Sequence, residues 1–307
     1  MGRVYAFAGP AGSGKTIGVL SSCPHFQYIA PVESNESFLS LYGRQIPVKT
    51  PHIVTTIAEA FAKYKAIAEK AKASNVQLPG IIVDEWSILS QNHVLTLQEA
   101  NNVWESLKIY NNTALQFIEY MLSCSWPTII IGHYMQPQEK HNEDGRVIFI
   151  PGTMQSPGYV LPSALPSRVS ALFLVVADDK HESGHMITRE STAGAVIKDR
   201  YNISPRTGNV PNNIRLLSRR LDPASFPYPA ELAWVDDYIT RGVAMLKEGK
   251  SSIADIEQEM IKQLPGKHEK QYDFARRQLM DYVLIHRAFV ADKAASKQLI
   301  SSIITLE

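Results

Sequence analysis

The chain is poor in cysteine, carries no excess of charge of either sign and contains no long apolar run. Its two cysteines, Cys23 and Cys124, stand far apart and outside any CxxC pair, which argues against a disulfide framework and a structural zinc site. With 31 Lys+Arg against 30 Asp+Glu, the net charge of +1 excludes a protein that holds nucleic acid by bulk charge. No apolar run approaches ~18 residues, so no transmembrane helix is expected.

The length and composition are those of a globular protein. The 307 residues are 45% hydrophobic and 20% charged, and at ~150 residues per domain they suggest two domains or one large α/β domain. The N-terminal apolar run Val4 to Ala8 leads directly into a glycine-rich loop, which is not the layout of a secretory signal. This start and the scarcity of cysteine predict a cytoplasmic protein with no membrane partner.

The glycine-rich loop is a complete phosphate-binding motif. It matches G-x-x-x-x-G-K-[ST] and lies between an apolar strand, Arg3 to Ala8, and an apolar segment that begins at Ile17. Glycines let backbone N–H groups surround a phosphate without Cβ clashes, and a helix starting near Gly14 adds the positive end of its dipole. The predicted nucleotide-binding residues are Gly9, Pro10, Ala11, Gly12, Ser13, Gly14, Lys15, Thr16 and Ile17.

The side chains of this motif predict how ATP and Mg²⁺ are bound. Lys15 would reach the β- and γ-phosphates, and the Thr16 hydroxyl would bind Mg²⁺. A second apolar run, Gly80 to Val83, ends in Asp84, as expected of a buried parallel strand with an acid at its carboxyl end. Asp84 is therefore the second predicted metal-binding residue, and a helix N-cap is the alternative interpretation.

Two acids are candidates for the base that polarises the attacking water. Glu85 directly follows Asp84. Glu33 follows the predicted strand Phe26 to Ala30, whose end also faces the γ-phosphate. A solvated loop glutamate is the alternative interpretation of Glu33, and the sequence does not choose between the two acids.

Strands and helices alternate along the first half of the chain, which predicts an α/β fold with a mostly parallel sheet flanked by helices. A core-facing stripe is expected on the last helix of this half, formed by Val103, Leu107, Ala114, Ile118 and Leu122. The predicted segments are a loop at 34–44, a short strand at 52–56, a helix at 58–72, a loop after Asp84 and a long helix at 98–123.

The next buried strand, Pro127 to Gly132, ends at His133. At the carboxyl end of a strand beside the first one, His133 would face the γ-phosphate and sense hydrolysis. The alternative is a polar residue whose hydrogen bonds are satisfied within a loop.

The chain from 134 to 166 is rich in turn residues and holds the predicted nucleic-acid contacts. Two flexible loops would touch a polymer there through Lys140, Arg146 and the ring of Tyr159. The alternative is an ordinary surface hairpin that includes a short strand at Val147 to Ile150.

Strands are also predicted at 171–177, 185–188 and 194–197, the last two as an antiparallel extension of the sheet. Lys198 and Arg200 follow, and side chains two residues apart on a strand point the same way. They could therefore reach one anion together, such as the γ-phosphate on a neighbouring subunit. A solvated strand end is the alternative interpretation.

The pattern changes at the Pro-rich segment 223–229. We predict a core domain at 1–222, a linker at 223–229 and a small helical accessory domain at 230–307. The helical part is not basic, and it is expected to contact other subunits or to bind a protein partner. A helix-turn-helix that reads DNA is an alternative.

The order of GPAGSGKT, IIVDE, IIIGH and KDR resembles the phage-encoded AAA-type nucleotide-binding proteins of the RecA-like group, some of which are single-strand-annealing recombinases. The resemblance covers about residues 3–205. It implies a RecA-like core that forms a ring or filament with ATP between subunits, bound in cis by Gly9 to Thr16 and Asp84 and reached in trans by Lys198 and Arg200. It also implies single-stranded DNA on loops at 135–146 and 151–165. Glu85 departs from the small residue that RecA-like proteins more often carry there.

The sequence thus predicts a Mg²⁺-dependent ATPase that acts as a homo-oligomer on single-stranded DNA, in phage recombination, repair or replication. The alternative from another class is a nucleotide-switched assembly protein whose C-terminal helices bind a protein partner. A small-molecule kinase is disfavoured because the chain has no arginine cluster typical of a mobile lid. A packaging motor with a nuclease is disfavoured because no carboxylate-rich, strand-bearing segment follows residue 205.

Overall fold

The chain was analysed as a computed structural model. It describes residues 3–43, 46–141, 147–150, 152–158, 160–178, 181–187, 198–205, 209–220, 226–247 and 271–304, together with positions 255–256, 258–259 and 262. None of the described helices combines the length and the apolar composition needed to cross a bilayer.

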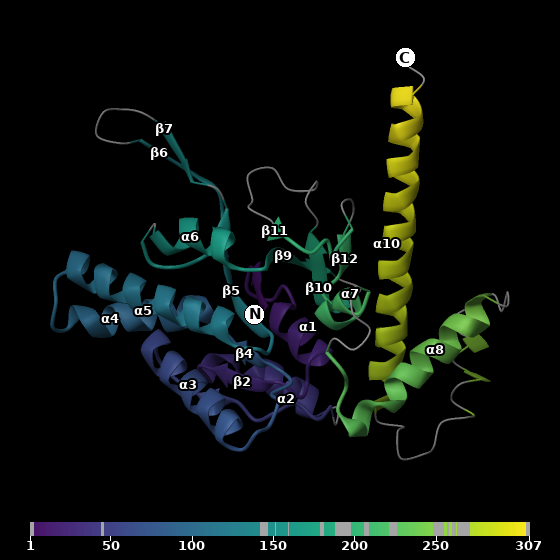
Figure 1. Ribbon diagram of the computed structural model, residues 1–307, viewed down its shortest axis with the longest axis horizontal. Coiled ribbons are helices and arrows are strands. Elements are labelled where there is room, and N and C mark those ends of the chain that lie inside the picture. Colours follow the sequence, from purple (N-terminus) through teal and green to yellow (C-terminus); the bar gives the residue numbers. More distant parts are fainter. Residues whose placement is uncertain are drawn as a thin grey trace.

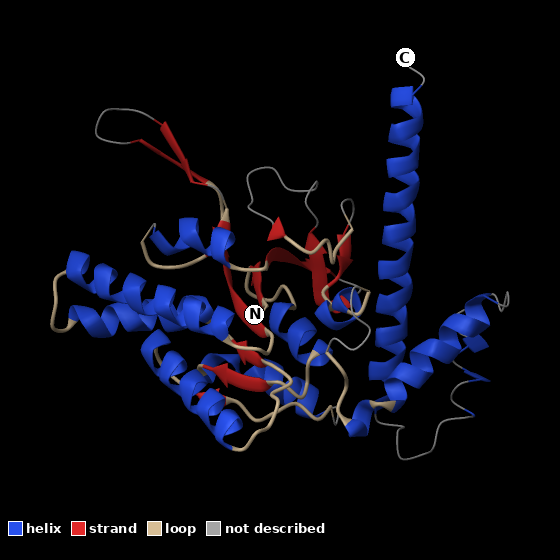
Figure 2. Cartoon of the chain, viewed as in Figure 1, coloured by secondary structure: helices blue, strands red, loops and turns tan. Residues whose placement is uncertain are grey.

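A mostly parallel sheet forms the centre of the molecule (Figures 1 and 2). Its strand order is β12-β10-β9-β1-β5-β4-β2-β3, and β11 and β8 pair outside this path with β9 and β5. The strands from β9 to β3 run parallel, whereas β10, β11 and β12 extend one edge in antiparallel fashion. The strands of this sheet are β1 (Val4–Gly9), β2 (Gln27–Ala30), β3 (His52–Ile53), β4 (Ile81–Val83), β5 (Thr128–Met135), β8 (Thr153–Met154), β9 (Ala171–Asp178), β10 (His181–Ile187), β11 (Lys198–Asp199) and β12 (Asn209–Pro211).

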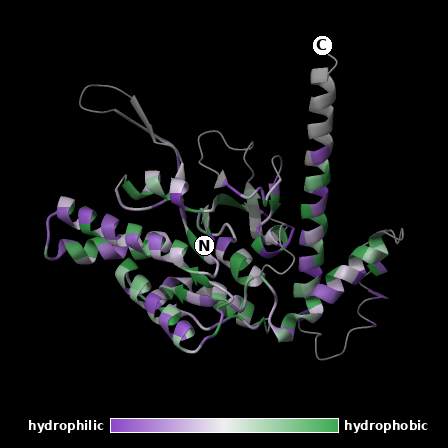
Figure 3. Cartoon of the chain, viewed as in Figure 1, coloured by the Kyte–Doolittle hydropathy of each residue, from purple (hydrophilic) through white to green (hydrophobic). Residues whose placement is uncertain are grey.

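Helices cover both faces of the sheet, because successive strand side chains point to opposite faces. Tyr5 and Phe7 of β1 belong to one buried cluster, and Val4 and Ala6 belong to the other. The hydropathy colouring in Figure 3 shows hydrophobic and hydrophilic residues alternating along the covering helices. These helices are α1 (Lys15–Ser22), α2 (Asn35–Gly43), α7 (Ile214–Ser218), α8 (Trp234–Lys247) and α10 (Tyr272–Ile304) on one face, and α3 (Ile57–Ala73), α4 (Trp86–Gln98), α5 (Val103–Ser123) and α6 (Val160–Arg168) on the other.

The predicted α/β class is confirmed, but two predicted loops are helices. The segment 34–44 contains the last residue of the 3-10 turn η1 (Val32–Ser34) and all of α2, whose helical face buries Phe38 and Leu41. The loop expected after Asp84 is also absent, since α4 starts at Trp86, whose side chain is fully buried. On α5, Ala114 and Ile118 are buried as predicted, whereas Val103 is 55% exposed.

The turn-rich segment after β5 contains more regular structure than its composition suggests. Strands β6 (Gln138–His141) and β7 (Val147–Ile150) form a separate two-stranded hairpin, which projects from the body of the molecule (Figure 1). Helix α6 then begins within the predicted second loop, and its Leu161 and Leu165 are buried against the core. The segments 138–141 and 147–150 therefore pair as a hairpin, and the loop prediction for 151–165 is wrong at 160–165, where α6 begins.

The C-terminal helices share a hydrophobic core with the sheet. Phe226, Tyr228 and Leu232 of the predicted linker and its continuation are buried, and so are Val235 of α8 and Leu279 of α10. All of them belong to the same buried cluster as Tyr5 and Phe7 of β1. The beginning of α10 therefore packs on the body of the molecule, while the rest of this 33-residue helix extends away from it (Figure 1).

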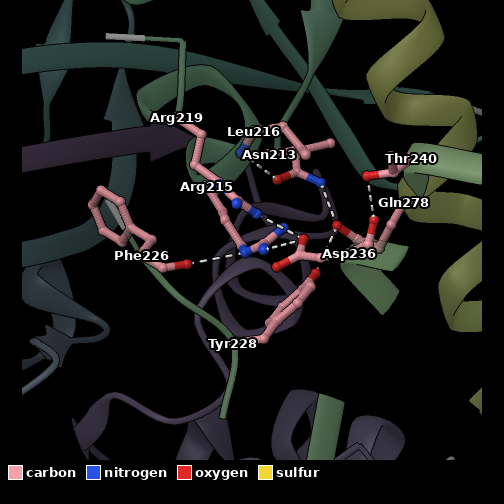
Figure 4. A network of polar contacts seen from close by, with 9 residues as sticks. All are labelled: Asn213, Arg215, Leu216, Arg219, Phe226, Tyr228, Asp236, Thr240 and Gln278. Carbon is pink, nitrogen blue, oxygen red and sulfur yellow. Dashed lines mark hydrogen bonds and ion pairs between the residues drawn. The ribbon is translucent and has the colours of Figure 1, made fainter. Parts of the chain in front are cut away.

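A buried polar network holds this junction together (Figure 4). Arg215 of α7 is fully buried and forms an ion pair with Asp236 of α8, while its Nε donates to the Phe226 carbonyl. Its guanidinium carbon also lies 3.5 Å from the centre of the Tyr228 ring. Arg219 shares the Asp236 carboxylate, at 2.6 Å.

Removing Asp236 is expected to destabilise the protein strongly. Asp236→Ala would leave the buried Arg215 guanidinium without its only carboxylate in this network, which typically costs about 3–5 kcal/mol. We expect a correspondingly lower midpoint in urea denaturation. The control is Asp237→Ala, which removes an exposed carboxylate from the same helix turn and should change stability by less than about 0.5 kcal/mol. Equal midpoints for the two variants would contradict a stabilising role for the ion pair between Arg215 and Asp236.

Candidate functional site

The loop between β1 and α1 has the backbone conformation of a phosphate-binding loop. Gly12 and Gly14 adopt left-handed conformations, with φ of 73° and 80°, which side chains other than glycine rarely tolerate. Gly14 is the N-cap of α1, so the free N–H groups of the first helical turn face the loop. This loop, Gly9 to Thr16, is called the P-loop below.

Close packing behind the P-loop also requires glycine. A Cβ on Gly9 would lie 2.5 Å from Ser13 Oγ and from the Val175 carbonyl oxygen. Gly184 of β10 has φ of 65°, and a Cβ there would collide with the Ser13 carbonyl oxygen. The antiparallel extension of the sheet thus supports the P-loop, and Gly184 is a contributor that sequence reasoning missed, because no local motif marks it.

Lys15 lies folded over the P-loop. Its Nζ donates to the Pro10 carbonyl oxygen at 3.4 Å, and the same Nζ lies 3.6 Å from Glu85 Oε1. The backbone of Lys15 is held from the other side by Asn212, whose Nδ2 donates to the Lys15 carbonyl oxygen at 3.2 Å. Asn212 is distant in sequence and belongs to no motif, so sequence reasoning missed this contact too.

Asp84 lies at the carboxyl end of β4, within reach of α1. Thr16 Oγ1 donates to Asp84 Oδ2 at 3.1 Å, as expected if both residues serve one cation. The Tyr28 hydroxyl, from the neighbouring strand β2, donates to the same oxygen at 2.9 Å. Asp84 Oδ1 is buried and has no hydrogen-bond partner among the described residues, which leaves it available to a ligand.

Burial and a neighbouring carboxylate determine the protonation of Asp84. Burial, followed by the charge of neighbouring Glu85, raises the pKa of Asp84 to about 7. The hydrogen bond from Tyr28 and the charge of Lys15 oppose this rise. Burial and the nearby Asp84 charge also raise the pKa of Tyr28 well above its usual range, so its hydroxyl keeps its proton and remains a donor.

Glu85 connects Lys15 to His133. Its carboxylate is buried, with Oε1 3.6 Å from Lys15 Nζ and Oε2 3.0 Å from His133 Nε2. His133 is opposite Gly9 in the pairing of β5 with β1, so its ring lies beside the start of the P-loop. The structure therefore brings together Lys15, Glu85 and His133, each of which the sequence analysis names as a candidate.

The backbone of His133 is fixed by the first turn of α4. Ser87 Oγ accepts from the His133 N–H at 2.9 Å and donates to the Gln155 carbonyl oxygen at 3.0 Å. The Gln155 N–H in turn donates to the His133 carbonyl oxygen at 2.8 Å. These hydrogen bonds hold the end of β5 beside Asp84 and Glu85. Only the tertiary structure reveals that Ser87 and Gln155 position His133.

The other candidate base, Glu33, lies in η1 after β2 and is exposed. No hydrogen bond or ion pair among the described residues joins it to Lys15, Glu85 or His133. Of the two acids, Glu85 is the one that the structure places against Lys15.

Arg200 lies near the amino ends of β1 and β9, whereas the P-loop of the same chain follows the carboxyl end of β1. Asp199 is level with Ala171 of β9, which pairs with Tyr5, four residues before Gly9. At ~3.3 Å per residue this is about 13 Å along the strand. The Arg200 guanidinium is exposed and donates to the Ser167 carbonyl oxygen, while Asp199 is buried and accepts from the Ile203 and Ser204 N–H groups. The structure describes the backbone of Lys198 within β11.

Of the three predicted nucleic-acid residues, the structure describes one, Lys140. Lys140 belongs to β6, where the backbone is described. Arg146 and Tyr159 lie outside the described residues.

The described residues fit a nucleotide with a divalent cation. The P-loop offers backbone donors, Lys15 offers a cation for phosphate, and Thr16 and Asp84 offer oxygen ligands of the kind that Mg²⁺ prefers. The unpartnered Asp84 Oδ1 and Ser13 Oγ, both buried, are polar atoms that such a ligand would satisfy.

No protein-family model matches the chain, and no curated protein matches it.

Proposed function

We propose that the chain is a Mg²⁺-dependent ATPase with a P-loop active site. The observation that carries this proposal is the meeting of Lys15, Glu85 and Asp84 at the carboxyl ends of β1 and β4, directly beside a loop with two left-handed glycines. In an open α/β sheet, ligands bind at the carboxyl ends of the strands. The P-loop motif, its conformation and the adjacent acid pair support the same site.

In the proposed reaction, the P-loop N–H groups and Lys15 bind the phosphates of ATP and stabilise the charge that develops on them. Mg²⁺, when bound by Thr16 and Asp84, would neutralise phosphate charge. Glu85 orients and polarises the water that attacks the γ-phosphate, because it is the acid that lies against Lys15. His133 contacts Glu85 and would respond to the presence of the γ-phosphate.

We further propose a RecA-like core that assembles into a ring or filament and acts on single-stranded DNA. The strand order supports this, since β5 with His133 lies between the P-loop strand β1 and the acid-bearing strand β4. The position of Arg200 is compatible with assembly, because it lies near the amino end of β9 and away from the P-loop of its own chain. The projecting β6–β7 hairpin is the proposed DNA contact.

One observation favours a second function, a nucleotide-switched assembly protein. A buried polar bridge links the P-loop to α10: Asn212 binds the Lys15 carbonyl, and the next residue, Asn213, donates to Gln278 and Asp281 of α10 at 2.8 and 2.9 Å. Through these hydrogen bonds, nucleotide binding would change the position of α10 and so its ability to bind a protein partner.

The test is ATP hydrolysis by the full chain with and without Mg²⁺ and single-stranded DNA, at low and moderate salt. We expect hydrolysis that requires Mg²⁺ and that DNA stimulates even at moderate salt, where contacts made by charge alone weaken. Hydrolysis that is indifferent to DNA would favour the assembly protein. Failure to bind ATP at all would contradict both functions.

A further inference from the structure

A further inference concerns Tyr28 and rests on the proposed nucleotide site. It lies on β2, one strand away from Asp84, and belongs to none of the motifs. Its side chain is 1% exposed, and its hydroxyl donates to Asp84 Oδ2 at 2.9 Å. We propose that Tyr28 is a positioning residue for metal binding, which holds the Asp84 carboxylate so that its second oxygen faces the cation.

Two donors share one oxygen of the Asp84 carboxylate. Thr16 from α1 and Tyr28 from β2 both donate to Asp84 Oδ2, from two different elements. A single hydrogen bond would leave the carboxylate free to rotate about its Cβ–Cγ bond, whereas two donors on Oδ2 fix that rotation. Oδ1 is then the oxygen left open, and it has no hydrogen-bond partner among the described residues although it is buried.

The two donors differ in what else they do. The Thr16 oxygen is itself a predicted metal ligand, so its position must adjust to the cation. Tyr28 is not a predicted metal ligand, and its ring is fixed within the core cluster that also contains Ile82 and Ile131. A buried tyrosine is a rigid donor with few rotamers, which suits it to hold a ligand in place.

A buried tyrosine hydroxyl also needs an acceptor for purely structural reasons. The chain offers a matched control for this simpler role in Tyr64. Its hydroxyl is equally buried and hydrogen-bonded, to Thr128 and Trp126, in the core cluster on the other face of the sheet. Tyr64→Phe therefore removes a buried hydroxyl without touching the nucleotide site.

The experiment compares Tyr28→Phe with Tyr64→Phe and the unchanged chain. A fluorescent ATP analogue is bound first in EDTA and then during titration with Mg²⁺, and binding of Mn²⁺ with nucleotide is followed by electron paramagnetic resonance. We expect Tyr28→Phe to raise the Mg²⁺ concentration for half-saturation by about tenfold, the usual size of an outer-shell effect on metal affinity. Nucleotide affinity in EDTA should stay within about twofold, and Tyr64→Phe should leave both quantities unchanged.

Three results would overturn the proposal, and the last of them differs from the others because it overturns the proposed function as well. If the unchanged chain binds the analogue with Mg²⁺ and Tyr28→Phe has the same Mg²⁺ dependence, then Tyr28 only fills the core. The same holds if Tyr28→Phe and Tyr64→Phe change Mg²⁺ dependence equally. If the unchanged chain binds no nucleotide under any condition, the proposed function itself fails, and the role of Tyr28 fails with it.

Discussion

Lys15→Ala is expected to abolish ATP hydrolysis and to weaken Mg²⁺-ATP binding about 10- to 100-fold. A hydrogen bond between charged groups contributes about 1.5–3 kcal/mol, and each 1.4 kcal/mol is a factor of ten in affinity. Lys15 is buried within the P-loop, and the Nζ atom that contacts Pro10 and Glu85 is the only lysine ammonium that the described residues place there. Nothing nearby in this part of the chain can therefore replace it.

Binding is measured by calorimetry and hydrolysis by phosphate release. The matched control is Lys70→Ala, an exposed lysine in the last turn of α3, which should behave like the unchanged chain. Because Lys15→Ala also removes the cation nearest Glu85, its thermal unfolding is compared as well. Hydrolysis that survives in a folded Lys15→Ala variant would refute the proposed P-loop active site.

Arg200→Ala is expected to reduce hydrolysis by about a thousandfold or more while changing ATP affinity less than about threefold. An arginine supplied by a neighbouring subunit typically contributes 10³–10⁵ to the rate of phosphoryl transfer. It acts mainly in the transition state, so binding of ATP is spared. The exposed guanidinium of Arg200 lies near the amino end of β9, away from the P-loop of its own chain, and this position is compatible with action in trans. Arg241→Ala, which removes an exposed arginine of α8, serves as the control.

Mixing two inactive variants separates action in trans from a structural role. An assembly of Lys15→Ala and Arg200→Ala subunits contains some interfaces in which an intact P-loop faces an intact Arg200. Activity should therefore reappear on mixing. If Arg200 instead only supports the end of α6 through the Ser167 carbonyl, then Arg200→Ala should lower thermal stability and binding together, and mixing should restore nothing.

The sequence was sufficient to predict those features that consecutive residues encode. The P-loop, its flanking strand and helix, and the acid at the end of β4 are each encoded within a few consecutive residues. Strand and helix periodicity likewise located β1, β5, β9 and α3 to within a few positions. Prediction was wrong where burial decided the outcome, since the polar composition of 34–44 indicated a loop but Phe38 and Leu41 made it a helix.

Only the tertiary structure decided which residues from distant parts of the chain are in contact. The sequence left Glu33 and Glu85 open, and the placement of β4 beside β5 brought Glu85, rather than Glu33, against Lys15 and His133. The contacts Tyr28–Asp84 and Asn212–Lys15 leave no trace in any local pattern. A motif reports the chemistry of neighbouring residues, whereas the orientation of a buried side chain depends on packing between elements that the sequence does not place next to one another.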